Sequence, residues 1–143
     1  MKVSKLNIEY DYDFDVYGLT SSIKDYKLAW LVNNATDLQL SRVEDHHIEN
    51  EPNSNFAFSN FIFKTSHNII RLLGNKSYKA ETLRVQTYLI PELKHFDYLL
   101  LKQGIGMEDF DERFITKIKE INGLDYVLKI DISQLKSKNN LLF

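Results

Sequence analysis

The sequence predicts an α+β fold, a mainly antiparallel sheet of about six or seven strands with two α-helices packed on one face. Apolar residues recur at helical spacing in two segments, and strand-like segments lie between and beside them. The connections in the middle of the chain are short, which favours hairpins over the long crossovers that parallel strands require. A chain of 143 residues fits a single globular domain, residues 1–143.

The composition is that of an ordinary globular protein, with 43% hydrophobic and 27% charged residues, and global disorder is therefore not expected. The chain contains no cysteine, which excludes disulfides, thiolate-bound zinc and thiol catalysis. We expect a cytoplasmic protein, because reducing compartments do not require disulfides. No segment reaches the roughly 18 apolar residues of a membrane span, so no membrane association is expected.

The first strand and the first helix are predicted near the N-terminus. Polar and apolar residues alternate over 8–16, which indicates a half-buried strand with one acidic face. The chain should then turn at 18–22, where Ser22 and Asp25 resemble a capping pair. The following helix is predicted over 23–35. Its apolar residues cover most of the circumference, which favours a central position in the core.

Five further segments are short apolar runs bounded by polar or turn residues, and we interpret them as strands: 38–43, 56–63, 69–73, 83–89 and 96–102. The longest loop is expected over 44–55. The spacing of the phenylalanines in the second of these segments changes parity, which a bulge or turn at Ser59-Asn60 would explain.

A second helix and a final strand are predicted towards the C-terminus. One apolar stripe runs along the helix, formed by Met107, Phe110, Phe114, Ile118 and Ile121. Acidic residues fill its first turns and lysines its last, which matches the helix dipole, and Asn122-Gly123 supplies a stop. The final strand places Tyr126, Leu128, Ile130 and Ile132 on one face.

Residues 90–98, Ile-Pro-Glu-Leu-Lys-His-Phe-Asp-Tyr, lie between two apolar runs and should connect the arms of a hairpin. Glu92 and Asp97 would then lie on opposite arms, close enough to act as a general acid/base pair. His95 could shuttle protons between them, and Tyr98 follows directly. Alternatively, the two acids accept hydrogen bonds from backbone amides or a tyrosine hydroxyl and lock the turn.

These nine residues, which we call the signature segment, resemble the signature of the IPExxxVDY family, small bacterial proteins with no established activity. Phe96 stands where that signature has valine. Residues 14–22, 25–33 and 135–143 are also similar to the family's first strand, first helix and C-terminus, so the resemblance covers nearly the whole chain. It implies a fold type but assigns no role to any residue.

A second candidate site lies on the first helix, where Asp25, Tyr26, Trp30 and Asn33 form a polar and aromatic set. Tyr26, Trp30 and Asn33 share one face at helical spacing. An indole flanked by a phenol and an amide could hold a flat ligand or anchor a protein partner. The other interpretation is that Trp30 packs in the core with its N–H bonded locally.

Metal and cofactor sites are not expected. His46 and His47 lie among acids, but adjacent histidines on a loop point to different sides and rarely share one ion. Asp11, Asp13 and Asp15 lack the glycine and the closing glutamate of a calcium loop. No phosphate-binding glycine loop and no nucleophile elbow is present.

The preferred hypothesis is a small interaction or regulatory domain without catalytic activity, bound to an unknown protein partner or to itself as a homodimer. An acid/base enzyme or small-ligand binder centred on the signature segment is the first alternative. RNA association is the second, through a basic segment formed by Lys64, Arg71, Lys76, Lys79 and Arg84. The apolar residues 141–143 should dock on the protein's own sheet or insert into a partner.

Overall fold

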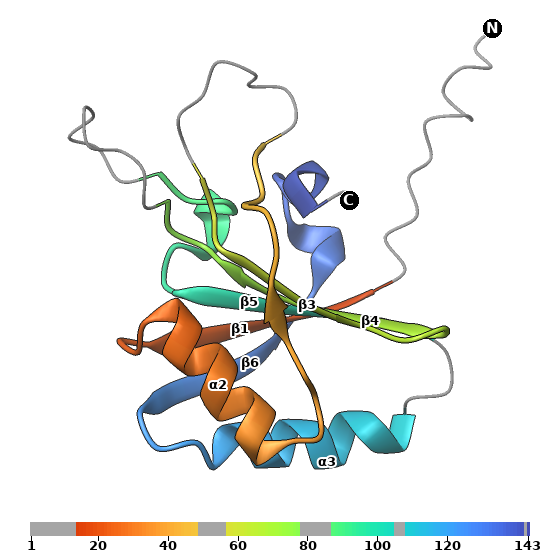
Figure 1. The fold of residues 1–143 in the computed structure, drawn as a ribbon. Helices are drawn as coiled ribbons and strands as arrows, with labels where there is room; N and C mark the ends of the chain where they lie inside the picture. The colour runs from red at the N-terminus through yellow and green to blue at the C-terminus, as the bar shows by residue number, and fades with distance from the viewer. Residues whose placement is uncertain (1–13, 49–56, 78–86, 105–107, 142) are drawn as a thin grey trace, which may run out of the picture.

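The computed structural model describes residues 14–48, 57–77, 87–104, 108–141 and 143. It contains one open sheet with both helices, α2 (Asp25–Ala35) and α3 (Glu108–Lys119), on the same face (Figure 1). The six strands are β1 (Asp15–Ser21), β2 (Ser41–Arg42), β3 (Asn60–Lys64), β4 (Asn68–Gly74), β5 (Tyr98–Gly104) and β6 (Leu124–Ile130). The predicted α+β class is confirmed.

The strand order is β2-β3-β4-β5-β1-β6, and every neighbouring pair is antiparallel. β1 lies between β5 and β6, so the first and last strands of the described chain are hydrogen-bonded to each other. In this register Leu19 is opposite Tyr98 on one side and Val127 on the other. The signature segment therefore ends where β1, β5 and β6 meet.

The helix side of the sheet holds one of two apolar clusters, and α2 and α3 cover it. Its buried members include Tyr17, Leu19, Leu28, Ala29, Val32, Phe61, Leu72, Leu100, Phe114, Ile118 and Ile121. The predicted stripe of the second helix is thus confirmed for its last three residues. Met107 and the side chain of Phe110 fall outside what the structure describes. Gly123, at φ 102°, turns the chain after α3 as predicted.

The opposite face of the sheet is covered by three short 3-10 helices, η1 (Pro91–Leu93), η2 (Ile132–Gln134) and η3 (Lys138–Leu141) (Figure 1). The apolar cluster beneath them consists of Val16, Phe58, Leu73, Leu89, Ile90, Leu99, Leu101, Leu135 and Leu141. Leu141 is fully buried, so the C-terminal segment docks on the protein's own sheet. The spacing of the phenylalanines changes parity because Phe58 packs in this cluster, whereas Phe61 packs on the helix side of the sheet.

The predicted turn at 18–22 is wrong, because most of it is β-strand. Gly18 lies in the middle of β1, opposite Leu99 and Leu128. A Cβ atom at Gly18 would lie 2.6 Å from Cγ of Phe96, so glycine is needed there to admit the ring. Most of the strand predicted over 8–16 falls outside the described residues, and β1 begins only at Asp15.

The predicted capping pair at the start of the first helix is also wrong. Lys24 is the N-cap residue and provides no side-chain hydrogen bond. The hydroxyl of Ser21 accepts a hydrogen bond from the Ile23 amide (3.0 Å), while the Asp25 carboxylate accepts one from its neighbour Tyr26 (2.6 Å). Ser21 and Asp25 therefore each accept a hydrogen bond from one backbone amide at this helix end, and the two residues do not form a capping box.

Three other predicted strands differ from the structure. The segment 38–43 contributes only the two residues of β2. In the described part of 83–89, only Tyr88 is strand-like, in an isolated bridge with Lys76. The final strand ends at Ile130 and Ile132 belongs to η2, while Tyr126 and Leu128 are exposed. Among the described residues no helix has the length and apolar character needed to cross a membrane.

Candidate functional site

The signature segment crosses the sheet face opposite the helices instead of forming a tight hairpin. Ile90 is extended, as expected for a residue before proline, and Pro91 opens η1. β5 begins at Tyr98 and pairs with β4, so the two arms that the sequence suggested are not neighbours in the sheet. The segment is therefore part of a long connection between β4 and β5.

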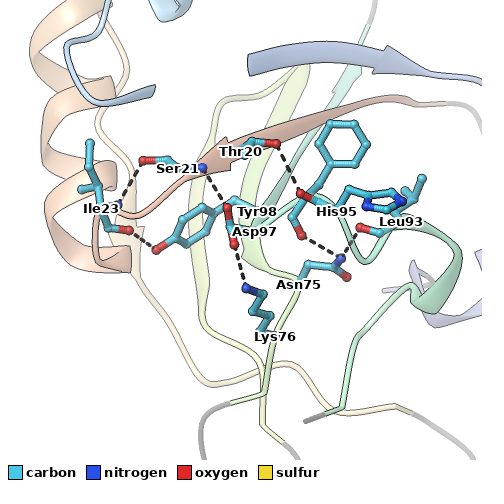
Figure 2. A network of polar contacts seen from close by, with 10 residues as sticks. Thr20, Ser21, Ile23, Asn75, Lys76, Leu93, His95, Asp97 and Tyr98 are labelled. Atoms are coloured by element: carbon cyan, nitrogen blue, oxygen red, sulfur yellow. Dashed lines mark hydrogen bonds and ion pairs between the residues drawn. The ribbon is translucent and has the colours of Figure 1, made fainter. Parts of the chain in front are cut away.

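Asn75, immediately after β4, is fully buried and holds this connection (Figure 2). Its side-chain amide donates to the carbonyls of Leu93 (2.9 Å) and Phe96 (3.0 Å), and its oxygen accepts from the amide of Ile90 (2.8 Å). Its backbone N–H also donates to the carbonyl of Asp97 (2.9 Å). Sequence reasoning missed this residue, because Gly74-Asn75 has the composition of an ordinary turn.

Asp97 joins the segment to β1 and to Lys76 (Figure 2). One carboxylate oxygen accepts from the backbone amide of Ser21 (2.8 Å), and the other lies 2.9 Å from the ammonium of Lys76. The Asp97 amide donates to the carbonyl of Leu19 (2.9 Å). The hydrogen bond that Lys76 donates to Asp97 is the main reason that the pKa of Lys76 is raised, so the lysine remains charged. Both oxygens of Asp97 are thus occupied.

Tyr98 and His95 contact the protein through different groups. The Tyr98 hydroxyl donates to the carbonyl of Ile23, at the entrance to α2. Burial, together with the nearby Asp25 and Asp97 charges, raises the pKa of Tyr98, so its phenol stays protonated. His95 is exposed, and its backbone carbonyl accepts a hydrogen bond from the Thr20 hydroxyl (3.3 Å). Neither of these contacts joins Glu92 to Asp97.

Glu92 binds the C-terminal segment. Its carboxylate accepts from the backbone amide of Ser137 (2.6 Å) and from the Ser137 hydroxyl (2.8 Å). Partial burial alone would raise the pKa of Glu92, but the hydrogen bonds from Ser137 outweigh it and the pKa is lowered. Glu92 and Asp97 therefore hold different segments, and the carboxylate pair expected of a general acid and base is not assembled by these contacts.

A pocket of about 460 Å³ lies beside Asp97 and Tyr98. Residues 21–25, which lead from the end of β1 to the start of α2, line it together with Ser59 and Lys76. Hydroxyls, lysines and carboxylates line it together with Ile23 and the Tyr98 ring, which suits a small molecule that carries polar groups. The signature segment contributes Asp97 and Tyr98 to the lining of this pocket.

The four candidate residues on the first helix do not form one site. Asn33 bonds both the amide (2.8 Å) and the carbonyl (3.0 Å) of Leu40, in the manner of a strand partner. Asp25 lies 3.8 Å from the guanidinium of Arg42. The core interpretation of Trp30 is wrong, because Trp30 and Tyr26 are 60% and 66% exposed. The helix packs on the sheet through Leu28, Ala29 and Val32, and this orientation leaves both aromatic rings exposed.

The histidine and basic candidates are dispersed. A ring nitrogen of His46 lies 2.7 Å from the carbonyl of Asn140, and burial lowers the pKa of this histidine. Within the described ranges no group of three His, Cys, Asp or Glu residues could hold a metal ion. In the basic segment Lys76 is paired with Asp97 and Arg71 lies 4.0 Å from the ring centroid of Phe143. Lys79 and Arg84 fall outside the described residues.

Asp15, the last of the three alternating aspartates, is the only one that the structure describes. It lies 3.7 Å from the ammonium of Lys102 and 3.8 Å from that of Lys129. Its carboxylate thus faces cations of β5 and β6. Comparison of the chain with protein-family models, with curated proteins and with solved structures gives no match.

Proposed function

We propose that this protein is a small cytoplasmic interaction domain without catalytic activity, and that Tyr26 and Trp30 form its contact surface with a second copy of the chain. We call these two residues the α2 contact surface. The observation that carries the proposal is the exposure of both rings, 66% and 60%, on a helix whose other side is buried. Membership of the IPExxxVDY family is part of the same proposal and rests on the signature segment.

Two aromatic side chains four residues apart on a helix lie side by side and present one continuous apolar area. Tryptophan and tyrosine are the residue types most enriched at the centres of protein interfaces, because they bury a large area at low conformational cost. The area therefore has the composition of an interface centre rather than of a solvated surface.

The charges along α2 support a second copy as the partner. Lys24 and Lys27 are exposed near the start of the helix, and Asp37 is exposed just after its end. None of the three forms an ion pair within the described part of the chain. If two α2 helices packed antiparallel about a two-fold axis, the lysines of each copy would lie near the aspartate of the other.

The contacts of the signature segment support the absence of catalysis. Asp97 and Glu92 each accept hydrogen bonds from fixed backbone amides, and Tyr98 keeps its proton. A general acid or base must exchange its proton with a substrate near neutral pH. Hydrogen bonds from Ser137 lower the pKa of Glu92 and burial raises the pKa of Tyr98, so neither group is suited to that task, and both oxygens of Asp97 are already engaged.

The proposal predicts that the protein self-associates and that Trp30→Ala weakens the dimer. We expect a loss of about 2 kcal/mol or more, about 30-fold in Kd, as for other central tryptophans at interfaces. Sedimentation velocity over a range of micromolar concentrations measures this directly. Trp30 is the only tryptophan, so quenching of its fluorescence by acrylamide should fall as the parent protein associates.

Tyr126→Ala is the matched control, because Tyr126 is also a large exposed aromatic residue, at 70%, but lies on β6. This variant should dimerise like the parent protein. A parent protein that stays monomeric throughout the concentration range would contradict self-association. Equal weakening by Trp30→Ala and Tyr126→Ala would contradict the location of the surface on α2.

A further inference from the structure

A second cavity, of about 300 Å³, lies on the sheet face opposite the helices and outside the signature segment. Its floor is formed by Ile69 and Arg71 of β4 and Leu101 and Gln103 of β5, and the C-terminal residues Leu141 and Phe143 close it. Apart from Arg71 and Gln103, these lining residues are apolar. The volume corresponds to that of about ten water molecules, which suits a small organic molecule.

Arg71 is the feature of this cavity that requires an explanation. The residue is half-buried, opposite Ile62 and Leu101 in its two strand neighbours, and burial lowers the pKa of its guanidinium. Among the described residues it forms no ion pair with a carboxylate. Removing a cation partly from water costs free energy, and proteins usually offset this desolvation cost by pairing the cation with an anion.

The ring of Phe143 compensates only one side of this cation. Its centroid lies 4.0 Å from the central carbon of the guanidinium, at the distance of a cation–π contact. Such stacking occupies the flat face of the group, whereas the N–H donors point outwards in its plane. His46, whose ring centroid lies 4.7 Å from that of Phe143, donates its own ring N–H to Asn140 and supplies no negative charge. The in-plane donors of Arg71 therefore remain available.

We propose that this cavity binds a small organic carboxylate. The carboxylate accepts two parallel hydrogen bonds from the in-plane N–H groups of Arg71, a geometry for which guanidinium and carboxylate are matched. The apolar body of the ligand packs between Leu101, Leu141 and the aliphatic side chain of Ile69. Gln103 adds a side-chain amide to the lining. The cavity is closed by the C-terminal residues, which pack on the sheet face opposite α2, so ligand binding there does not require self-association through α2.

NMR titration with two pairs of compounds tests this proposal on the parent protein. Benzoate and hexanoate carry the carboxylate, and benzamide and hexanamide are neutral compounds of nearly the same size. We expect a carboxylate to shift the backbone amide signals of Ile69, Arg71, Leu101 and Gln103 in a saturable way. The matching amide should bind roughly tenfold more weakly or worse, since it loses a charge-assisted bidentate contact.

Two variants locate the binding. Arg71→Met retains an unbranched apolar side chain and removes the cation, and it should lower benzoate affinity roughly tenfold or more. Lys64→Met removes an exposed cation outside the cavity and should leave the affinity unchanged. The proposal is overturned if neither carboxylate gives saturable shifts, if the neutral amides bind equally well, or if Arg71→Met binds benzoate as tightly as the parent protein.

Discussion

Replacing Asn75 by alanine should lower the free energy of unfolding by about 3–5 kcal/mol, the largest effect that we expect from a single substitution in this protein. The side chain of Asn75 is fully buried and makes three hydrogen bonds to the signature segment, at Ile90, Leu93 and Phe96. Alanine would leave these backbone groups without partners, at about 1–3 kcal/mol each, although water can reach some of them. A domain of this size is stable by only about 5–15 kcal/mol.

Urea unfolding of Asn75→Ala beside the parent protein measures this effect. Asn34→Ala is the matched control, because Asn34 is an exposed residue of α2 and alanine is the best helix former. The control should be as stable as the parent protein or slightly more so. If Asn75→Ala were as stable as the control, the hydrogen bonds of Asn75 could not be what holds the segment in place.

Leu141→Ala should cost about 2–5 kcal/mol. Leu141 is fully buried in the apolar cluster on the face opposite the helices, where it packs with residues of β1, β4 and β5. Its removal leaves a cavity and weakens the attachment of the C-terminal segment to the sheet. The size of the effect depends on how far the segment can close over the space.

The same unfolding experiment on Leu128→Ala provides the control for Leu141→Ala. Leu128 is 56% exposed on β6, so the identical chemical change removes little buried area. We expect it to cost under about 1 kcal/mol. Equal losses in the two leucine variants would mean that the C-terminal segment does not depend on Leu141 for its docking.

Periodicity predicted the fold class, because burying one apolar face imposes a spacing that is visible in the sequence. The stripe of α3 is the clearest example, and its buried residues Phe114, Ile118 and Ile121 lie where the spacing places them. The position of Gly18 was not predictable in this way. Glycine is typical of turns, but here it lies within a strand because Phe96, far away in sequence, needs the space of a side chain.

The candidate site was predicted less well, because its residues act through partners distant in the chain. Glu92 and Asp97 are five positions apart, yet one binds Ser137 and the other Ser21 and Lys76. No local pattern marks Asn75 as a buried residue that binds the backbone of another segment. Conversely, the apolar character of Trp30 suggested the core, and only the packing of α2 shows which side of the helix faces outwards.

The structural role of the signature segment is tested most directly by urea unfolding of Asp97→Ala beside Lys76→Ala and Asp125→Ala. We expect Asp97→Ala to lose about 1.5–3 kcal/mol, because the Ser21 amide loses a charged acceptor. Lys76→Ala should lose under about 1 kcal/mol, since its ion pair is solvent-exposed. Asp125→Ala changes an exposed residue and should leave the free energy of unfolding unchanged. If Asp97→Ala unfolds at the same urea concentration as the parent protein, Asp97 does not stabilise the fold. Its carboxylate would then have to act on a ligand or a partner.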